Sequence, residues 1–200
     1  MNEKIETIVR NLGWILPLLG AVLILIALFT PFAVSKGVDG ISISTQSDVW
    51  YWGFYKGQDR TLFLPKSFLL NVILSIIMLF FAILILVFSI IYGLNHLNRK
   101  SYGESIAIIV VLIYFLMTLT IKFTEYAFSL MPDSDTTYMG KYFHFWAFRL
   151  ESFGFSGINL AIILINLGSI LSLSKSRKSF FYIEITAFTI WILGLNFTAF

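Results

Sequence analysis

The sequence predicts an all-α bundle of transmembrane helices, four spans and a fifth after them, with a small extracellular antiparallel β-sheet. Three observations predict this fold. Of the 200 residues, 58% are hydrophobic and 12% are charged, whereas soluble domains have about 25% charged residues. Five long apolar runs hold nearly all of the hydrophobic residues, and short β-prone segments lie in the long loops between them. A chain of this size cannot hide so much apolar surface from water, so we expect one polytopic domain, residues 1–200, in lipid.

Each apolar run is long enough to cross a hydrocarbon core of about 30 Å at 1.5 Å per helical residue. The runs cover residues 12–30, 67–94, 105–130, 156–173 and 180–200. The first run could instead be a signal peptide, but it is longer than the roughly 7–15 residues of a signal core, so we interpret it as a retained span. The last run carries Glu184 and could lie in the interface, although its length favours a fifth span.

Basic residues predict the orientation. The two short connections and the N-terminus carry Lys4, Arg10, Arg99, Lys100, Lys175, Arg177 and Lys178. The outer side, which comprises the loops 31–66 and 131–155 and Lys122 at the end of the third run, has as many basic residues over a much greater length. By the positive-inside rule, the N-terminus and the short connections face the cytoplasm and the long loops face outward. Five spans then place the C-terminus outside a cell membrane.

Small and polar residues recur at seven-residue spacing within the spans, which favours close left-handed helix packing. These residues are Gly13, Gly20 and Ala27; Ser75, Ala82 and Ser89; Asn159 and Asn166; and Ala187 and Gly194. They could hold one bundle together, or one set could serve a partner subunit. We favour the first interpretation.

The outer loops contain β-prone segments. Residues 41–44 alternate with period two, with Gly37 and Gly40 marking a turn before them. Residues 49–55, 62–64 and 141–148 are further strand candidates, rich in β-branched or aromatic residues. In a strand over 49–55, Trp50 and Trp52 would face the same side and Gly53 would follow at a bend. The two tryptophans could form a packed sheet core, which we favour, or an exposed adhesive patch.

One motif in the first outer loop is similar to a known family. The run contains Trp50, Trp52, Gly53, Phe54 and Tyr55, and it resembles the outer-loop signature of the claudin and peripheral-myelin-protein superfamily. Near the end of the second outer loop, Arg149, Glu151 and Gly154 resemble that superfamily's run leading into the fourth span. The resemblance implies a tetraspan membrane protein whose outer sheet contacts other proteins. The chain differs from that superfamily in lacking the paired cysteines and in having a fifth span.

No catalytic, cofactor or metal site is expected. The chain has no cysteine, which excludes cysteine-based metal and redox chemistry. It also lacks phosphate-loop, Ser-His-Asp and zinc-protease signatures. His144 lies among Asp133, Asp135 and Glu151, but their spacing matches no ligand motif. A net charge of +3 is too small to indicate nucleic acid.

Three functions remain open. The first is a non-enzymatic membrane protein, claudin-like, whose outer sheet makes contacts in cell-surface adhesion or membrane organisation. The second is a small accessory subunit of a larger membrane complex. The third is a transporter or channel lined by Asn159, Asn166 and Glu184, since an intramembrane acid is a functional candidate. Glu184 also lies close enough to the basic residues of the last short connection to reach them, which we favour. The expected partners are the lipid bilayer and either a second copy or another membrane protein.

Overall fold

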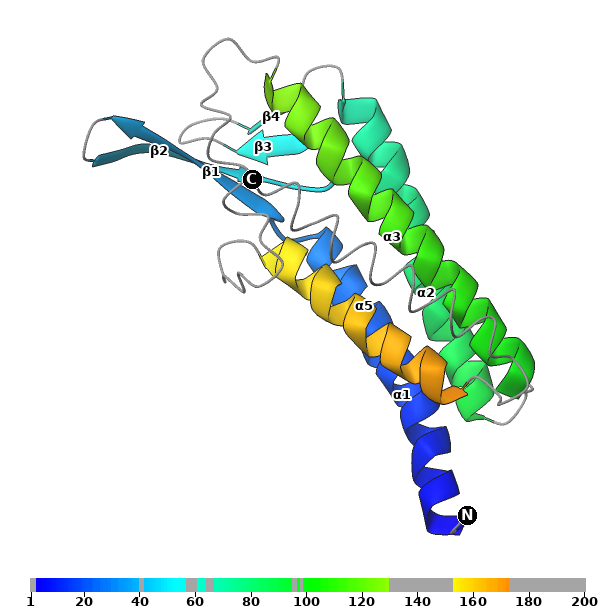
Figure 1. Cartoon of the computed structure of the whole chain (residues 1–200). Coiled ribbons are helices and arrows are strands. Elements are labelled where there is room, and N and C mark those ends of the chain that lie inside the picture. The colour runs from blue at the N-terminus through cyan, green and yellow to red at the C-terminus, as the bar shows by residue number, and fades with distance from the viewer. Residues whose placement is uncertain are drawn as a thin grey trace.

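The computed structural model describes residues 3–39, 42–56, 61–63, 67–94, 97, 99–129 and 153–172. Four helices and four strands form in these residues (Figure 1). The helices are α1 (Glu3–Leu28), α2 (Phe68–Gly93), α3 (Arg99–Ser129) and α5 (Phe153–Ser172). The strands are β1 (Ala33–Asp39), β2 (Ser42–Val49), β3 (Phe54–Lys56) and β4 (Thr61–Phe63).

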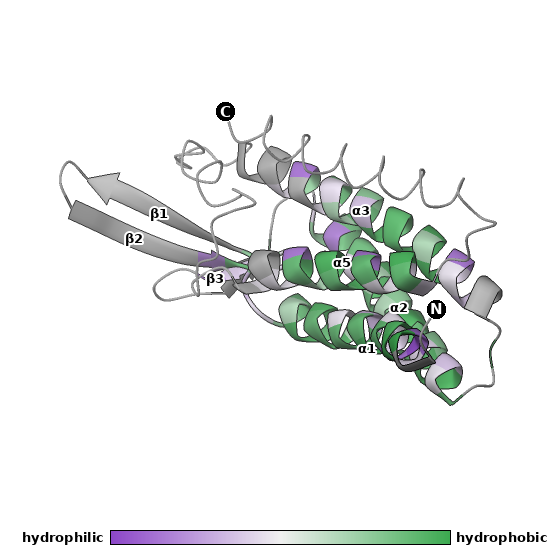
Figure 2. Ribbon diagram, turned by 60° about the horizontal axis from the view of Figure 1, so that its bottom comes forward, coloured by the Kyte–Doolittle hydropathy of each residue, from purple (hydrophilic) through white to green (hydrophobic). Residues whose placement is uncertain are grey.

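Three helical segments are long and apolar enough to cross a membrane: Ile5–Leu28, Phe68–Gly93 and Tyr102–Thr124. Each overlaps one of the first three predicted spans, although the first begins earlier than residue 12 and the third ends before residue 130. The fourth predicted span forms a shorter apolar helix, Gly157–Ser172, within α5. Hydrophobic residues cover most of each helix in Figure 2, as expected of helices that lie in lipid. The predicted fifth span, residues 180–200, lies outside the described residues.

The four helices form a closed ring. α1 packs against α2 and α5, and α3 packs against the same two helices. The most extensive of these contacts joins α1 to α5, the first and the last of the described helices. The two run antiparallel, since Gly20 meets Ala161 while Gly13 meets Ser172.

The α1–α5 contact depends on small residues. A Cβ atom on Gly20 would lie 2.7 Å from the Ala161 carbonyl oxygen, and one on Gly13 would lie 2.6 Å from Ser172 Oγ. Gly168 of α5 likewise lies against the ring of Pro17. Removing side chains at these points lets the two backbones approach, which is how helices associate in a solvent as apolar as themselves.

Small residues point inward throughout the bundle. Each glycine, alanine and serine of the four helices whose burial is described is buried or half-buried. The exposed positions of α2 are instead all large and apolar. They are Leu69, Ile73, Ile76, Phe80, Ile83, Val87 and Ile90. This outer surface fits lipid chains better than it fits another helix, because helix contacts in membranes favour small residues.

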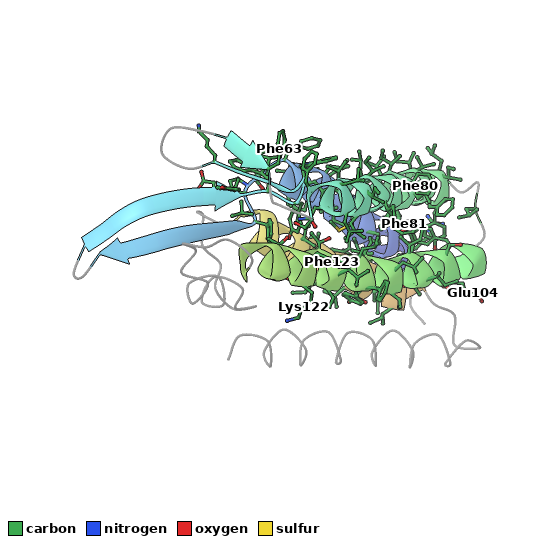
Figure 3. The ribbon with its side chains drawn as sticks, turned by 90° about the horizontal axis from the view of Figure 1, so that it is seen from above. Phe63, Phe80, Phe81, Glu104, Lys122 and Phe123 are labelled. Carbon is green, nitrogen blue, oxygen red and sulfur yellow. The ribbon has the colours of Figure 1, made fainter. Side chains whose placement is uncertain are left out.

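The four strands form one antiparallel sheet in the order β1-β2-β3-β4. The β1–β2 pairing contains a bulge between Gly37 and Val38. Only Asp48 and Val49 of β2 pair with β3. The rest of β1 and β2 therefore forms a two-stranded ribbon, defined here as residues 33–39 and 42–47. Figures 1 and 3 show this ribbon extending away from the helices.

The predicted strands differ from this sheet in three places. The segment 41–44 is the start of a longer strand, β2, which runs on to Val49. The strand expected over 49–55 is wrong, because the chain turns between Trp50 and Gly53 before β3 begins. Strand β1 was not expected at all, since Gly37 indicated a turn. The candidate at 62–64 corresponds to β4, and 141–148 lies outside the described residues.

Candidate interaction site: the tryptophan turn and the sheet it holds

The chain reverses between β2 and β3 in a tight turn over residues 50–53, which we call the tryptophan turn. The Gly53 N–H donates to the Trp50 carbonyl at 3.1 Å, and the Trp50 N–H donates to the Phe54 carbonyl at 3.0 Å. Gly53 has a φ of +78°. This pattern matches a three-residue hairpin loop that ends in a left-handed glycine.

Gly53 is required for a second reason. A Cβ atom at this position would lie 3.0 Å from the Phe68 carbonyl oxygen and from Asn71 Cβ. The turn therefore rests directly on the first turn of α2. Both the backbone conformation and the close approach exclude a larger residue.

Tyr51 is the buried centre of the turn. Its side chain is fully buried, and its ring stacks on Phe32 with centroids 4.4 Å apart. Its carbonyl accepts a 2.9 Å hydrogen bond from Ser75 Oγ of α2. Burial raises the pKa of the Tyr51 phenol above its ordinary value, so the phenol stays neutral. No partner for that hydroxyl appears among the described residues.

Trp52 attaches the turn to the end of α1. Its Nε1 donates a 2.7 Å hydrogen bond to the Leu28 carbonyl, one of the C-terminal carbonyls that a helix leaves without a partner. Its ring also contacts Phe29, with centroids 5.6 Å apart. The tryptophan turn thus contacts both α1 and α2.

Trp50 has different neighbours from Trp52. It stacks on Phe54 with centroids 5.0 Å apart, within the sheet rather than on a helix. The expectation that both tryptophans share one face of a strand is therefore wrong, because a turn and not a strand separates them. Both are half-buried, so neither is a fully exposed adhesive patch.

Two further contacts fix the sheet end of the bundle. The Gly154 N–H of α5 donates to the Pro31 carbonyl at 2.9 Å, beside the start of β1. Asn71 Nδ2 of α2 donates to Thr124 Oγ1 of α3 at 3.1 Å. Gly154 is the one residue of its predicted motif that the structure describes; Arg149 and Glu151 lie outside the described residues.

The predicted polar pair of α5 lies inside the bundle. Asn166 donates to the Tyr114 hydroxyl of α3 and, at 2.8 Å, to the Ile162 carbonyl. Asn159 is fully buried, and neither amide atom finds a partner among the described residues. The residues with polar side chains that the structure describes as buried are all neutral: serine, threonine, asparagine or tyrosine. Glu104 of α3 is half-buried.

A polar node joins all four helices at the other end of the bundle. Pro17 has no N–H, so the Gly13 carbonyl of α1 lacks its usual helical donor. Tyr102 of α3 donates to this carbonyl at 3.2 Å and Ser172 of α5 donates at 3.1 Å. Ser89 of α2 lies 3.1 Å from the Tyr102 hydroxyl. Ser89 was expected on a seam, whereas Pro17 and Tyr102 were not expected to take part.

The charged candidates lie elsewhere. Glu184 and His144 are outside the described residues. Within the part of the chain that the structure describes, no group of three His, Cys, Asp or Glu side chains could hold a metal ion. Lys122 of α3 points away from the bundle (Figure 3).

Comparison with protein-family models, with curated proteins and with solved structures finds no match to this chain.

Proposed function

We propose that this chain is a non-enzymatic, multi-pass protein of the cell membrane whose outer β-sheet binds other proteins, in cell-surface adhesion or membrane organisation. The observation that carries the proposal is the ribbon of β1 and β2. It extends beyond the helices (Figure 1) and joins the rest of the sheet only through Asp48 and Val49 of β2. The tryptophan turn bonds to α1 and α2 next to the point where β2 ends. The end of the ribbon nearest the helices is therefore fixed to the bundle.

The helix surfaces favour this proposal over an accessory subunit that binds through its spans. Gly13 and Gly20 face α5. Ser75 bonds to the tryptophan turn and Ser89 to Tyr102 of α3. These small residues therefore make contacts within the protein and not with a partner subunit. The exposed face of α2 offers only large apolar side chains, which suit lipid.

A transport function has weaker support. A path for ions or protons needs charged or ionisable groups in the bundle or a water-filled cavity, and the buried polar residues of the described core are neutral. Among the described residues, Asn159 favours such a path most, because both atoms of its buried amide lack a described partner, whereas Asn71 and Asn166 lack one only at Oδ1.

The arrangement also supports a claudin-like protein. Four helices carry a sheet at one end, and the first long loop supplies its described strands. The run Trp50 to Tyr55 forms the turn that holds this sheet. In this proposal the sheet lies outside the cell, the N-terminus lies in the cytoplasm, and residues 180–200 form a further span.

Photo-crosslinking in native membranes tests the proposal. A photoreactive amino acid replaces Thr45 in the ribbon or, as a matched control, Ile83 on the exposed face of α2. We expect protein adducts at Thr45 and only lipid adducts at Ile83. Protein adducts at Ile83 with none at Thr45 would instead identify an accessory subunit that binds through its spans.

A further inference from the structure

The short hairpin of β3 and β4 has two different faces. Phe54 of β3 lies opposite Phe63 of β4, and Tyr55 lies opposite Leu62. Because side chains alternate along a strand, Phe54, Lys56 and Phe63 share one face. Tyr55 lies on the other face and packs against the hydrophobic core. The side chain of Phe63 is 64% exposed and that of Lys56 is also exposed, so the first face is the outer face of the hairpin.

Aromatic side chains on this outer face lead to the start of α2. Trp50 stacks on Phe54 with centroids 5.0 Å apart. Phe54 and Phe63 are direct cross-strand neighbours, and the Phe63 ring contacts Phe68 with centroids 4.5 Å apart. These four residues are called the aromatic row. Leu69, the next residue of α2, is 71% exposed and is the first of the large apolar side chains on the outer surface of that helix, so the two surfaces are continuous.

The hairpin lies level with the ends of two membrane spans. The first apolar segment ends at Leu28 and the second begins at Phe68. Trp52 bonds to the Leu28 carbonyl, and Gly53 lies against Phe68. The turn before the hairpin is therefore at the depth where both spans end, and the contact of Phe63 with Phe68 places the hairpin there too. Aromatic rings are enriched at this depth, which is the membrane–water interface.

We propose that the aromatic row binds the phospholipid bilayer, along the boundary between the headgroups and the acyl chains. Lys56 lies at the end of the same face, where its stem can lie beside the rings and its ammonium group can reach the headgroups. In Figure 3, Phe63 lies on the same side of the molecule as Phe80 of α2, opposite Lys122. The surface is thus an extension of the lipid-facing side of α2.

The sheet then has two parts with different surroundings. The hairpin of β3 and β4 lies in the interface, whereas the ribbon extends beyond the helices (Figure 1). This inference does not depend on what the ribbon binds. It also holds for either orientation of the chain, because both surfaces of a bilayer have an interfacial layer.

Fluorescence quenching measures the depth of the hairpin. The chain has no natural cysteine, so Phe63→Cys takes a single thiol-reactive fluorophore, and the full chain is placed in phosphatidylcholine vesicles. The lipids carry a nitroxide either near the headgroup or near the end of the acyl chain, and iodide is the aqueous quencher. The controls are Thr45→Cys in the ribbon and Ile76→Cys, about 12 Å along α2 from its start.

We expect the headgroup-level nitroxide to quench the label at Phe63 most strongly. The acyl-chain nitroxide should be the stronger quencher at Ile76, and iodide should be the stronger quencher at Thr45. A label at Phe63 that responds like the one at Thr45 would show that the row faces water, and the inference would be wrong.

Photo-crosslinking keeps an aromatic ring in place. A photoreactive phenylalanine analogue replaces Phe63 in native membranes, beside the variants at Thr45 and Ile83 described above. We expect lipid adducts at Phe63, as at Ile83. Protein adducts at Phe63, or a lack of lipid adducts there, would overturn the inference. Lipid adducts at Phe63 with no protein adducts at Thr45 would support it and remove the proposed function, so the two proposals fail separately.

Discussion

The carbonyl oxygen of Gly13 shows how a single missing N–H is compensated in this bundle. Pro17 removes the helical donor, and hydroxyl groups from two other helices replace it. An unpaired carbonyl in lipid costs several kcal/mol. The bundle therefore tolerates Pro17 because the two hydroxyl groups bond to the carbonyl that Pro17 leaves without a donor. The sequence shows each of these residues, but only the packing of α1, α3 and α5 shows that they meet.

A double-mutant cycle measures this dependence. Tyr102→Phe should lower the free energy of unfolding by about 0.5–1.5 kcal/mol, because the Gly13 carbonyl loses a donor. In a Pro17→Ala background the loss should be smaller, since the new N–H can bond to that carbonyl. The contact of the Pro17 ring with Gly168 is kept by both proteins of the wild-type pair and lost from both proteins of the Pro17→Ala pair, so it cancels within each comparison. Equal losses in the two backgrounds, measured by denaturation in mild detergent, would show that Tyr102 acts independently of Pro17.

A second residue-scale prediction concerns the two tryptophans. Trp52→Phe should destabilise the outer region by about 1 kcal/mol, because the Leu28 carbonyl loses its donor. Trp50→Phe is the matched control, since it preserves an aromatic ring against Phe54 and removes no hydrogen bond that the structure shows for Trp50. Limited proteolysis of the outer loops compares the two. If Trp50→Phe is the more sensitive variant, the attachment to α1 is not what holds the turn.

At the scale of elements, the helices were predictable and the strands were only partly so. A long apolar run is a strong signal, so α2 agrees closely with residues 67–94. α1 ends near the predicted boundary but begins at Glu3, well before residue 12. α3 begins earlier than expected, at Arg99, because polar residues can continue a helix beyond the apolar run. The strand expected over 49–55 failed because the αL conformation of Gly53 depends on a fit against Phe68 that no local pattern reveals.

The candidate site was predicted at the level of the motif but not of its contacts. The sequence indicated Trp50, Trp52 and Gly53 as part of an outer-loop signature, and the structure places them in one turn. Tyr51 did not, although it is the residue of that turn that is fully buried. Its role comes from Phe32 and Ser75, which are distant in sequence.

The α1–α5 contact supports a third prediction. Gly20→Ile should cost about 1–3 kcal/mol or more, because the added side chain would overlap Ala161 and Ile165 across the contact. Leu19→Ile is the control, since Leu19 is exposed and lies next to Gly20 on the same helix. Thermal unfolding in detergent distinguishes the two variants. Similar midpoints for both would mean that α1 and α5 do not pack closely at this level.

At the scale of the whole molecule, the remaining question is which end faces the cytoplasm. We predict that a cysteine at Ser44 reacts with an impermeant thiol reagent added to intact cells, because the ribbon lies outside. A cysteine at Ser101, near the basic pair Arg99 and Lys100, should react only after the membrane is opened. The reverse pattern would invert the topology and place the sheet in the cytoplasm.

The polar node also has a consequence for the order of synthesis. The two donors to the Gly13 carbonyl are made much later than Gly13 itself. Tyr102 follows it by 89 residues and Ser172 by 159 residues. At roughly 5–20 residues per second, the ribosome needs about 10–30 s to make the last of these partners. During that time the first helix sits in the bilayer with an unpaired carbonyl and with a glycine-lined face that α5 has not yet covered. We expect the insertion machinery to protect α1 until Ser172 has been made, and truncation before α5 would leave the first helix without its most extensive helix contact.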